Sequence, residues 1–594
     1  MDGIRTDDSA KVTAQRWLGD FAEALASGDA ERLAPLFADE CHWRDILAFT
    51  WNLQTTSGAT AIAHRLAPLL AQAAPHALQL AEDRTPPRLV TRAGTAAIEA
   101  IFTFETAVGR CNGVVRLVYE GARPRAWTLM TALDEIRGHE DPANGKRWQD
   151  VDWKRNFGGE NWLDRRRRAI AYADHDPVVL VVGAAQAGLT VAARLSMLGI
   201  DTLAIERKPR LGDSWRDRYH ALTLHNETRV NHFPYMPFPR SWPVFIPKDM
   251  LANWFELYAE AMELNIWTGT ELKSASYDEV AERWTVALTR ADGSERVMHP
   301  RHIVFCNGVS SVPKWPDLPG LQDFRGTVRH SGDYGSGLDW KGKRAVVLGT
   351  GTSGHDVAQD LAVSGAAHVS LIQNGPTLIV SLKEAQSPYA LYDEDISFED
   401  CDLLATSFPY PIYSRSHRQI TIKNAEADRE LLEGLKKRGF KLTSGPDGTG
   451  WQIMYQNRGG GYYFDAGCSQ MVVEGRIGLI QFAAIERFCD EGVRLKDGPV
   501  HRADLLVLAS GYEGQKEALR GVLGDAVTER IGPVWGFDAE GELAGMWRPT
   551  GQPGAWFLAG GLAQCRIFSK VLALQIKARE LGLTRHGLPQ PPTA

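Results

Sequence analysis

Residues 177–188 read PVVLVVGAAQAG: a proline, an unbroken apolar run and a glycine turn. A run of this length, rich in branched residues, is typical of a buried parallel strand. Residues 189–199 then have helical composition, and a second apolar run at 202–205 ends in Glu206. The order strand, glycine turn, helix, strand, acid predicts a βαβ unit that binds a dinucleotide. A βαβ unit with a tight turn and no ligand is the alternative.

Each position of this motif has a physical role. Gly183 allows the tight turn, and Gly188 allows the helix and strand to pack closely. The free N–H groups and positive dipole end of the helix favour a pyrophosphate, and Glu206 would accept hydrogen bonds from ribose hydroxyls. The middle glycine is replaced by Ala185, whose methyl group narrows the approach to phosphate. The expected contacts of this first dinucleotide are Gly183, Ala185, Gln186, Gly188, Glu206, Arg207 and Trp215.

The same pattern returns at residues 344–354, which read RAVVLGTGTSG and contain a complete GxGxxG. Two such units predict two dinucleotides, as a flavoprotein reduced by a nicotinamide nucleotide requires. The following strand ends at Asn374 without a carboxylate, which favours NADPH over NADH, although no arginine stands there to clamp a 2′-phosphate. The expected contacts of the second dinucleotide are Gly349, Gly351, Thr352, Ser353, Gly354 and Asn374.

Residues 324–334, FRGTVRHSGDY, lie between the two turns and read FxGxxxHxxxY. With the flanking turns, this segment resembles the fingerprint of the class B flavoprotein monooxygenases. That group includes flavin-containing, Baeyer–Villiger and N-hydroxylating monooxygenases and the plant indole-3-pyruvate monooxygenases. Residues 211–215 (LGDSW) resemble the family's GGxW segment, and residues 236–239 (MPFP) resemble its turn. Residues 504–512 (DLLVLASGY), with Gly511, resemble the strand that re-enters the flavin domain.

The resemblance covers residues 177 to about 580 and implies an α/β fold with two Rossmann-like domains. The FAD domain would be split into residues 177–332 and 485–594, with an NADPH domain and an insertion at 333–484. The implied activity uses FAD, NADPH and O2 to form a flavin C4a-hydroperoxide. One oxygen atom would then enter a small organic substrate, by N- or S-oxygenation or by oxidation at a carbonyl or 2-oxo acid.

Three residues are catalytic candidates by the same resemblance. Tyr334 ends the fingerprint where Baeyer–Villiger enzymes more often have tryptophan, which favours the flavin-containing and indole-pyruvate branches. His225 resembles a position of the indole-pyruvate branch, and Asn226 lies near an asparagine usual in the flavin-containing branch. An ordinary polar turn is the alternative for His225 and Asn226. His330 is expected to hydrogen-bond backbone between domains, not to transfer protons.

Residues 1–135 form a separate α+β unit in this interpretation, and residues 136–176 a linker with one short helix. Helical patterns come first, followed by three strand-like runs at 97–106, 113–119 and 126–133. This order resembles the SnoaL-like cone, which often encloses a pocket. His42, Asp45 and Trp51 would line such a pocket. A scaffold or a dimerisation module is the alternative.

Composition restricts the remaining possibilities. The chain has 594 residues with 44% hydrophobic and 23% charged, the balance of an ordinary globular protein, and its net charge of -7 argues against nucleic acid as a partner. No apolar stretch is long enough to span a bilayer, so no membrane partner is expected. The seven cysteines form no CxxC pair, which predicts no zinc site and no redox dithiol. We therefore expect a cytoplasmic, metal-free enzyme, with a homodimer left open.

Three alternatives to a coupled monooxygenase of the flavin-containing type stay open at this point. The first is an uncoupled NAD(P)H oxidase or reductase flavoprotein, although a disulfide reductase would need the missing CxxC. The second is a Baeyer–Villiger-type monooxygenase. The third is a protein that keeps FAD without turnover.

Overall fold

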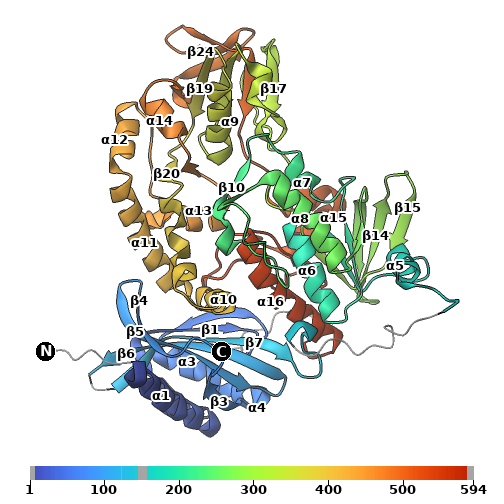
Figure 1. Ribbon diagram of the computed structural model, residues 1–594, viewed down its shortest axis with the longest axis vertical. Coiled ribbons are helices and arrows are strands. Elements are labelled where there is room, and N and C mark those ends of the chain that lie inside the picture. Colours follow the sequence, from blue (N-terminus) through green and yellow to red (C-terminus); the bar gives the residue numbers. More distant parts are fainter. Residues whose placement is uncertain (1–6, 122, 145–156, 585–594) are drawn as a thin grey trace.

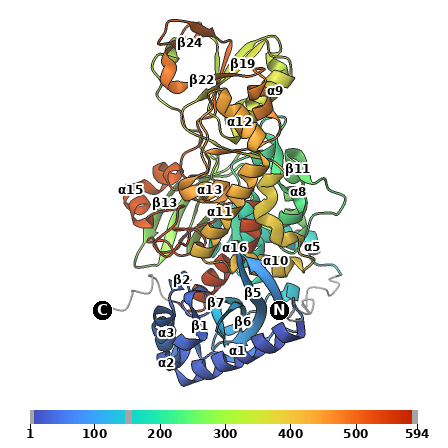
Figure 2. The same cartoon turned by 90° about the vertical axis from the view of Figure 1, so that its left-hand side faces the viewer.

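The computed structural model describes residues 7–121, 123–144 and 157–584. It contains two five-stranded parallel sheets and one seven-stranded mixed sheet, arranged one above another along the long axis of the molecule (Figures 1 and 2). Helices cover the parallel sheets, which explains why their central strands are buried on both faces and read as continuous apolar runs. The predicted α/β class with two Rossmann-like units is confirmed.

The N-terminal unit is a sheet of order β2-β1-β7-β6-β5-β3, with β4 paired to β5. The long strands β5, β6 and β7 confirm the three strand-like runs read from the sequence, and β1 joins β7 in parallel. Its helices are α1 (Asp7–Ser27), α2 (Ala30–Leu33), α3 (Ala59–Leu66) and α4 (Leu70–Ala73), and its strands are β1 (Phe37–Ile46), β2 (Leu53–Ser57), β3 (His76–Leu80), β4 (Arg88–Arg92), β5 (Thr95–Glu105), β6 (Gly109–Glu120) and β7 (Arg123–Ile136). The likeness to SnoaL-like cones stays a prediction.

The first parallel sheet has the order β12-β9-β8-β16-β27 and contains the first glycine turn. Its strands are β8 (Val179–Val182), β9 (Thr202–Ile205), β12 (Asn265–Trp267), β16 (His302–Phe305) and β27 (Ala555–Phe557). The helices around it are α5 (Trp162–Ala171), α6 (Gln186–Met197), α7 (Asp213–Arg216), α8 (Lys248–Ala261), α15 (Arg520–Ile531) and α16 (Leu562–Glu580). Two smaller sheets accompany it: β10 (Thr223–Glu227) with β11 (Phe245–Pro247), and β13 (Glu271–Asp278), β14 (Arg283–Thr289) and β15 (Glu295–Met298).

The second parallel sheet has the order β17-β26-β18-β19-β22 and contains the second glycine turn. Its strands are β17 (Thr327–His330), β18 (Arg344–Leu348), β19 (His368–Gln373), β22 (Gly478–Gln481) and β26 (Leu505–Leu508). The hairpin strands β23 (Ile485–Cys489), β24 (Gly492–Leu495) and β25 (Val500–Arg502) lie beside it, and α9 (Thr352–Val363) follows the turn.

Sheet membership corrects the expected division of the chain at two places. Strand β26 was expected to re-enter the first sheet, but it pairs with β17 and β18 in the second. Strand β17, assigned to residues 177–332 of the first unit, also belongs to the second sheet. The strand that returns to the first sheet is β27, which pairs with β16. A short apolar parallel strand carries no mark of which of two similar sheets it joins, so the sequence could not decide this.

An inserted helical segment extends from the second sheet down to the N-terminal unit (Figure 1). It comprises β20 (Leu378–Ser381), η9 (Glu384–Asp393), α10 (Phe398–Thr406), α11 (Tyr410–Ala427), α12 (Arg429–Lys437), α13 (Gly450–Arg458), β21 (Tyr462–Asp465) and α14 (Cys468–Val473). Within the described ranges, no helix is both long and apolar enough to cross a membrane.

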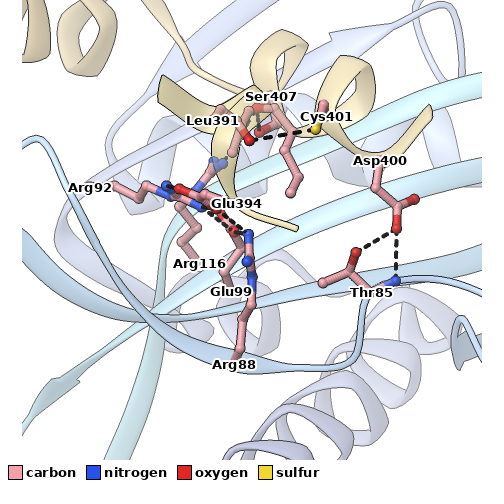
Figure 3. A network of polar contacts seen from close by, with 11 residues as sticks. Thr85, Arg88, Arg92, Glu99, Arg116, Leu391, Glu394, Asp400, Cys401 and Ser407 are labelled. Carbon is pink, nitrogen blue, oxygen red and sulfur yellow. Dashed lines mark hydrogen bonds and ion pairs between the residues drawn. The ribbon is translucent and has the colours of Figure 1, made fainter. Parts of the chain in front are cut away.

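A buried ion network joins the N-terminal sheet to this insertion (Figure 3). Glu99 is only 2% exposed and accepts hydrogen bonds from Arg116 (2.8 Å), Arg92 (2.7 Å) and Arg88 (2.9 Å). Arg88 and Arg92 also bond Glu394, directly after η9. Burial alone would raise the pKa of Glu99, but the Arg116 charge and the Arg92 hydrogen bond lower it to about 2. The insertion is therefore held against the N-terminal unit by matched charges.

Candidate nucleotide and substrate cleft

The first glycine turn is built by close backbone contacts. Gly183 has φ 101°, and a Cβ there would lie 2.6 Å from the carbonyl oxygen of Cys306. A Cβ on Gly188 would lie 1.8 Å from the carbonyl oxygen of Gly183. Both contacts are with backbone, which cannot move aside as a side chain can. The strand, turn and helix therefore pack as the sequence motif requires.

The alanine at the middle position is compatible with this turn. Ala185 caps α6 with φ −87° and ψ −162°, an extended conformation that any residue adopts. Gly351 occupies the matching place before α9 with φ −79° and ψ −175°, and a Cβ there would meet nothing closer than 3.7 Å. A methyl group at this position therefore causes no backbone strain. Its only effect is to limit how closely a phosphate can approach the backbone of the turn.

The acid predicted to bind ribose lies beside the first turn. Glu206 follows β9, and its carboxylate accepts hydrogen bonds from the backbone N–H groups of Ala184 (3.1 Å) and Lys208 (3.0 Å). Trp215 Nε1 donates to Gln186 Oε1 at 3.2 Å, at the start of α6. The turn, the helix N-terminus and the carboxylate thus face one space, the donor and acceptor set that a dinucleotide requires.

The second turn repeats the first in detail. Gly349 has φ 115°, with a Cβ position 2.5 Å from the Ala509 carbonyl oxygen, and a Cβ on Gly354 would lie 2.1 Å from the Gly349 carbonyl oxygen. Thr352 Oγ1 donates to the carbonyl oxygen of Tyr462 at 3.2 Å, which brings the insertion against the N-terminus of α9.

Both turns open into a single cleft of about 1830 Å³. This volume exceeds that of an ordinary pocket for one small ligand. All the predicted nucleotide-binding residues line it except Gly188, which lies behind the turn. The lining residues are Gly183, Ala185, Gln186, Glu206, Arg207, Trp215, Gly349, Gly351, Thr352, Ser353, Gly354, Asn374 and Gly511. The cleft is thus able to hold two dinucleotides that face one another.

Two buried polar atoms between the turns have no hydrogen-bond partner within the described residues: Arg218 Nε and Tyr512 Oη. The Arg218 Cζ atom lies 5.5 Å from the centroid of the Tyr512 ring. Arg218 forms no ion pair with any of the described residues. Because a partly buried cation without a counter-charge is costly, this position suits a bound anion such as a phosphate.

The catalytic candidates separate into two groups. His225 and Asn226 lie on β10 and line the cleft, where Asn226 Nδ2 donates to Tyr389 Oη at 3.1 Å. Burial lowers the pKa of His225 to about 4, so its ring is neutral at physiological pH. Tyr334, however, is buried outside the cleft and donates to Asp360 on α9 at 3.1 Å. This geometry gives Tyr334 a structural position and does not support its predicted catalytic role.

The fingerprint histidine bonds backbone through both ring nitrogens. His330 Nε2 lies 3.0 Å from the Gly511 carbonyl oxygen, and Nδ1 accepts from the Gly332 N–H at 3.0 Å. The histidine therefore bonds backbone, as expected, but both partners follow strands β17 and β26 of the second sheet, so the bonds lie within one unit and not between two.

The N-terminal candidates do not reach the cleft. Asp45 is buried and accepts from Thr131 Oγ1 (2.7 Å) and from the Thr50 N–H (2.8 Å), so it holds the turn after β1. His42 Nδ1 lies 2.8 Å from Ser57 Oγ on the neighbouring strand. Trp51 is absent from the cleft wall as well. None of the three lines the cleft, and the Asp45 carboxylate is satisfied within the unit, so the structure does not support the predicted pocket.

Sequence reasoning missed four wall residues that the structure brings together: Arg44, Tyr389, Tyr413 and Gln452. No motif marks them. The available signal was the helical spacing of Tyr413 with His417 and of Trp451 with Tyr455, which places two polar-aromatic faces on neighbouring helices α11 and α13. Among the described residues, no cluster of His, Cys, Asp and Glu has the arrangement of a metal site.

Comparison with known proteins gives consistent findings. The family described as flavin-binding monooxygenase-like matches residues 178–422. The indole-3-pyruvate monooxygenase YUCCA1 of Oryza sativa subsp. japonica is 28% identical over 354 residues, which cover 59% of this chain and 80% of that protein. The probable indole-3-pyruvate monooxygenase YUCCA3 of Arabidopsis thaliana is 30% identical over 341 residues, which cover 56% and 72%.

Two solved structures share the fold. Cyclohexanone monooxygenase with bound epsilon-caprolactone aligns with a TM-score of 0.51 at 18% identity, over 69% of this chain and 89% of that one. OTEMO in complex with FAD and NADP aligns with a TM-score of 0.51 at 19% identity, over 69% and 87%.

Proposed function

The chain belongs to the flavin-binding monooxygenase-like family, and on that premise we propose that its first glycine turn holds FAD and its second NADPH. The protein is an FAD- and NADPH-dependent monooxygenase that takes O2 and a small organic substrate. The observation that carries the proposal is that two glycine turns, on two separate parallel sheets, open into one cleft.

Charge supports this order of the two nucleotides. Glu206 stands beside the first turn, where its carboxylate would accept hydrogen bonds from the unphosphorylated ribose of FAD. The matching position after the second turn is the exposed Asn374, which would not repel a 2′-phosphate. Arg218 and Arg458 also line the cleft without an ion pair in the described ranges, so they leave positive charge available for phosphate.

Bound FAD supplies the redox chemistry, by accepting hydride from NADPH and activating O2. The chain's own residues bind, orient and exclude water. Asn226 is held by its hydrogen bond to Tyr389, and the neutral ring of His225 packs edge-on against Phe464 at 5.3 Å. With a pKa of about 4, His225 carries no proton to give at neutral pH. We therefore assign His225 and Asn226 a positioning and binding role at the reacting end of the cleft.

The reaction type is proposed from the relatives. Their names specify indole-3-pyruvate, which supports oxidation at a carbonyl group, while N- or S-oxygenation and Baeyer–Villiger chemistry are the alternatives. A screen of amines, thioethers, ketones, aldehydes and 2-oxo acids, measuring NADPH consumption together with product, distinguishes these. An uncoupled oxidase would form hydrogen peroxide in equal amount with every compound.

Stopped-flow absorbance tests the assignment of the cofactors. NADPH should bleach the flavin band at about 450 nm in the wild-type protein. Gly351→Asp should abolish this reduction while FAD stays bound, because the added carboxylate enters only the second turn. Ala185→Asp, the matched change in the first turn, should lose FAD. If Gly351→Asp loses both nucleotides, or NADPH never bleaches the wild type, the proposal is wrong.

A homodimer and a cytoplasmic location complete the proposal. All seven cysteines are buried and free, which agrees with a reducing compartment. Light scattering of the purified protein and fractionation of the source cells test these two points.

A further inference from the structure

The end of the cleft beyond Asn226 is continuous with the N-terminal unit. Asn226 bonds Tyr389, and Tyr413 Oη donates to Gln452 Oε1 at 2.8 Å, with all four residues on the cleft wall. Arg44 on β1 lines the same cleft as Tyr413. A line of side chains therefore runs from the predicted reacting end to a strand of a different unit.

Arg44 closes this end of the cleft together with Glu542. Arg44 Nε donates to Glu542 Oε1 (2.8 Å) and Nη2 to Oε2 (2.6 Å), while Nη1 bonds the Thr406 carbonyl oxygen. Thr55 Oγ1 adds a hydrogen bond to Glu542 Oε1 at 3.0 Å. The Arg44 side chain is 11% exposed and that of Glu542 is 4% exposed. Because the two groups form a bidentate pair, this wall presents no net charge.

The cleft-lining cations that form no ion pair in the described part of the chain lie at the nucleotide end. They are Arg207, Arg218, Lys314 and Arg458. Arg207 follows Glu206, and Lys314 donates its backbone N–H to Gly511. Arg458 packs over Gly461, next to the Tyr462 carbonyl that contacts Thr352. No unpaired cation is therefore found between Asn226 and Arg44 within the described residues.

The cleft wall also offers neutral polar atoms that lack partners. Trp451 Nε1, Trp547 Nε1 and Gln456 Oε1 are buried without a hydrogen-bond partner in the described residues, and all three residues line the cleft. Trp451 is 7% exposed and Trp547 is 3% exposed. A buried unsatisfied polar group costs about 1–3 kcal/mol. An uncharged ligand with a hydrogen-bond acceptor would satisfy the indole N–H groups.

We propose that the N-terminal unit closes the substrate end of the cleft through Arg44, and that the Arg44–Glu542 pair selects uncharged compounds over carboxylates. The inference rests on the proposed function, since it concerns the substrate of the same site. A carboxylate would lose its hydration here without gaining a free cation as partner. A ketone or thioether carries no charge and therefore has a much smaller desolvation cost. The proposed preference for uncharged compounds differs from the substrate in the relatives' names, indole-3-pyruvate, which carries a carboxylate.

The test uses phenylacetone and phenylpyruvate, which differ only by a methyl group or a carboxylate on the ketone. Dissociation constants are measured on the oxidised holoenzyme from the change in flavin absorbance. The wild type should bind phenylacetone at least tenfold more tightly. Glu542→Gln releases the charge of Arg44 and should lower this ratio at least tenfold, by strengthening the binding of phenylpyruvate. Glu540→Gln, on the same loop but outside the cleft wall, should leave the ratio unchanged.

A double change, Arg44→Gln with Glu542→Gln, removes both charges and should return the ratio to the wild-type value. The proposal is overturned if the wild type binds phenylpyruvate as tightly as phenylacetone. It is equally overturned if Glu542→Gln behaves like Glu540→Gln. Reduction by NADPH is recorded on the same samples. If that reduction is normal while the ratios fail, only the inference is wrong; if reduction is absent, the proposed function fails as well.

Discussion

A single histidine after the second glycine turn links the turn to the pH dependence of stability. His355 is buried, and its ring stacks on Tyr463 at 4.1 Å. Burial lowers the pKa of His355 to about 4, against the opposing hydrogen bond to the Gly351 carbonyl oxygen. The unfolded chain therefore binds a proton at His355 at a higher pH than the folded chain does.

The sign of the effect follows from this difference. As pH falls from 6.5 towards 4, the stabilisation by neutral His355 is lost at about 1.4 kcal/mol per pH unit. His355→Phe keeps a stacking ring but cannot titrate. Its free energy of unfolding should therefore fall less steeply with decreasing pH than that of the wild type, by about 1.4 kcal/mol per pH unit. Urea unfolding at pH 4.5, 5.5, 6.5 and 7.5 measures this. The exposed His64→Gln serves as control, and equal slopes for His355→Phe and wild type would contradict the prediction.

The glycine-turn motifs predicted residues that line the cleft, whereas the fingerprint tyrosine does not line it. Glu206 and Gly349 sit in motifs whose spacing is fixed by backbone geometry, so sequence alone located them on the cleft. Tyr334 belongs to an equally specific motif, yet its hydroxyl bonds Asp360 outside the cleft. A sequence motif indicates that a position requires a certain residue type. It does not show whether packing or catalysis imposes that requirement.

At the scale of the element, the second strand–turn–helix offers two glycines of opposite sensitivity. Gly354→Ala would bring a Cβ to 2.1 Å from backbone, whereas Gly351→Ala would meet nothing closer than 3.7 Å. We expect Gly354→Ala to force α9 away from its strand and to lower the free energy of unfolding by several kcal/mol. Losses above about 4–5 kcal/mol are exceptional for single substitutions. Gly351→Ala should fold normally and only weaken NADP+ binding, as Ala185 is tolerated in the first turn.

Thermal unfolding and NADP+ titration by calorimetry separate the two effects. A loss of melting temperature in Gly351→Ala as large as that in Gly354→Ala would refute this account of the turn.

Strands were predicted well in type but not in sheet membership. Branched apolar runs identified β8 and β18 because a strand buried on both faces needs them, whereas β26 was identified through the family resemblance of residues 504–512. Which sheet β26 joins depends on the chain that precedes and follows it, and those loops have no periodic pattern. The inserted helices lacked any motif, so the part of the cleft that they build could not be predicted.

The whole molecule depends on charge pairs that dock the N-terminal unit onto the insertion. Besides the Glu99 network, Asp400 on α10 accepts hydrogen bonds from the Thr85 N–H (2.8 Å) and hydroxyl (2.5 Å), as Figure 3 shows. Asp400 also pairs with Arg84 at 3.0 Å. Glu394 directly follows η9 and Asp400 lies in the first turn of α10, so the two carboxylates fix the segment between η9 and α10.

Removing both carboxylates should uncouple the two units. Glu394→Ala with Asp400→Ala removes the carboxylates of the insertion that Arg84, Arg88 and Arg92 bond, while Glu99 still pairs with Arg88 and Arg92. Breaking a buried pair costs about 3–5 kcal/mol, which is an upper bound for these partly buried pairs. Differential scanning calorimetry should then show a separate, earlier transition for the N-terminal unit, where the wild type unfolds it together with the insertion. Glu426→Gln, which breaks an exposed pair with Arg429, should leave the trace unchanged. A single unshifted transition in the double variant would mean that apolar packing, and not charge, holds the units together.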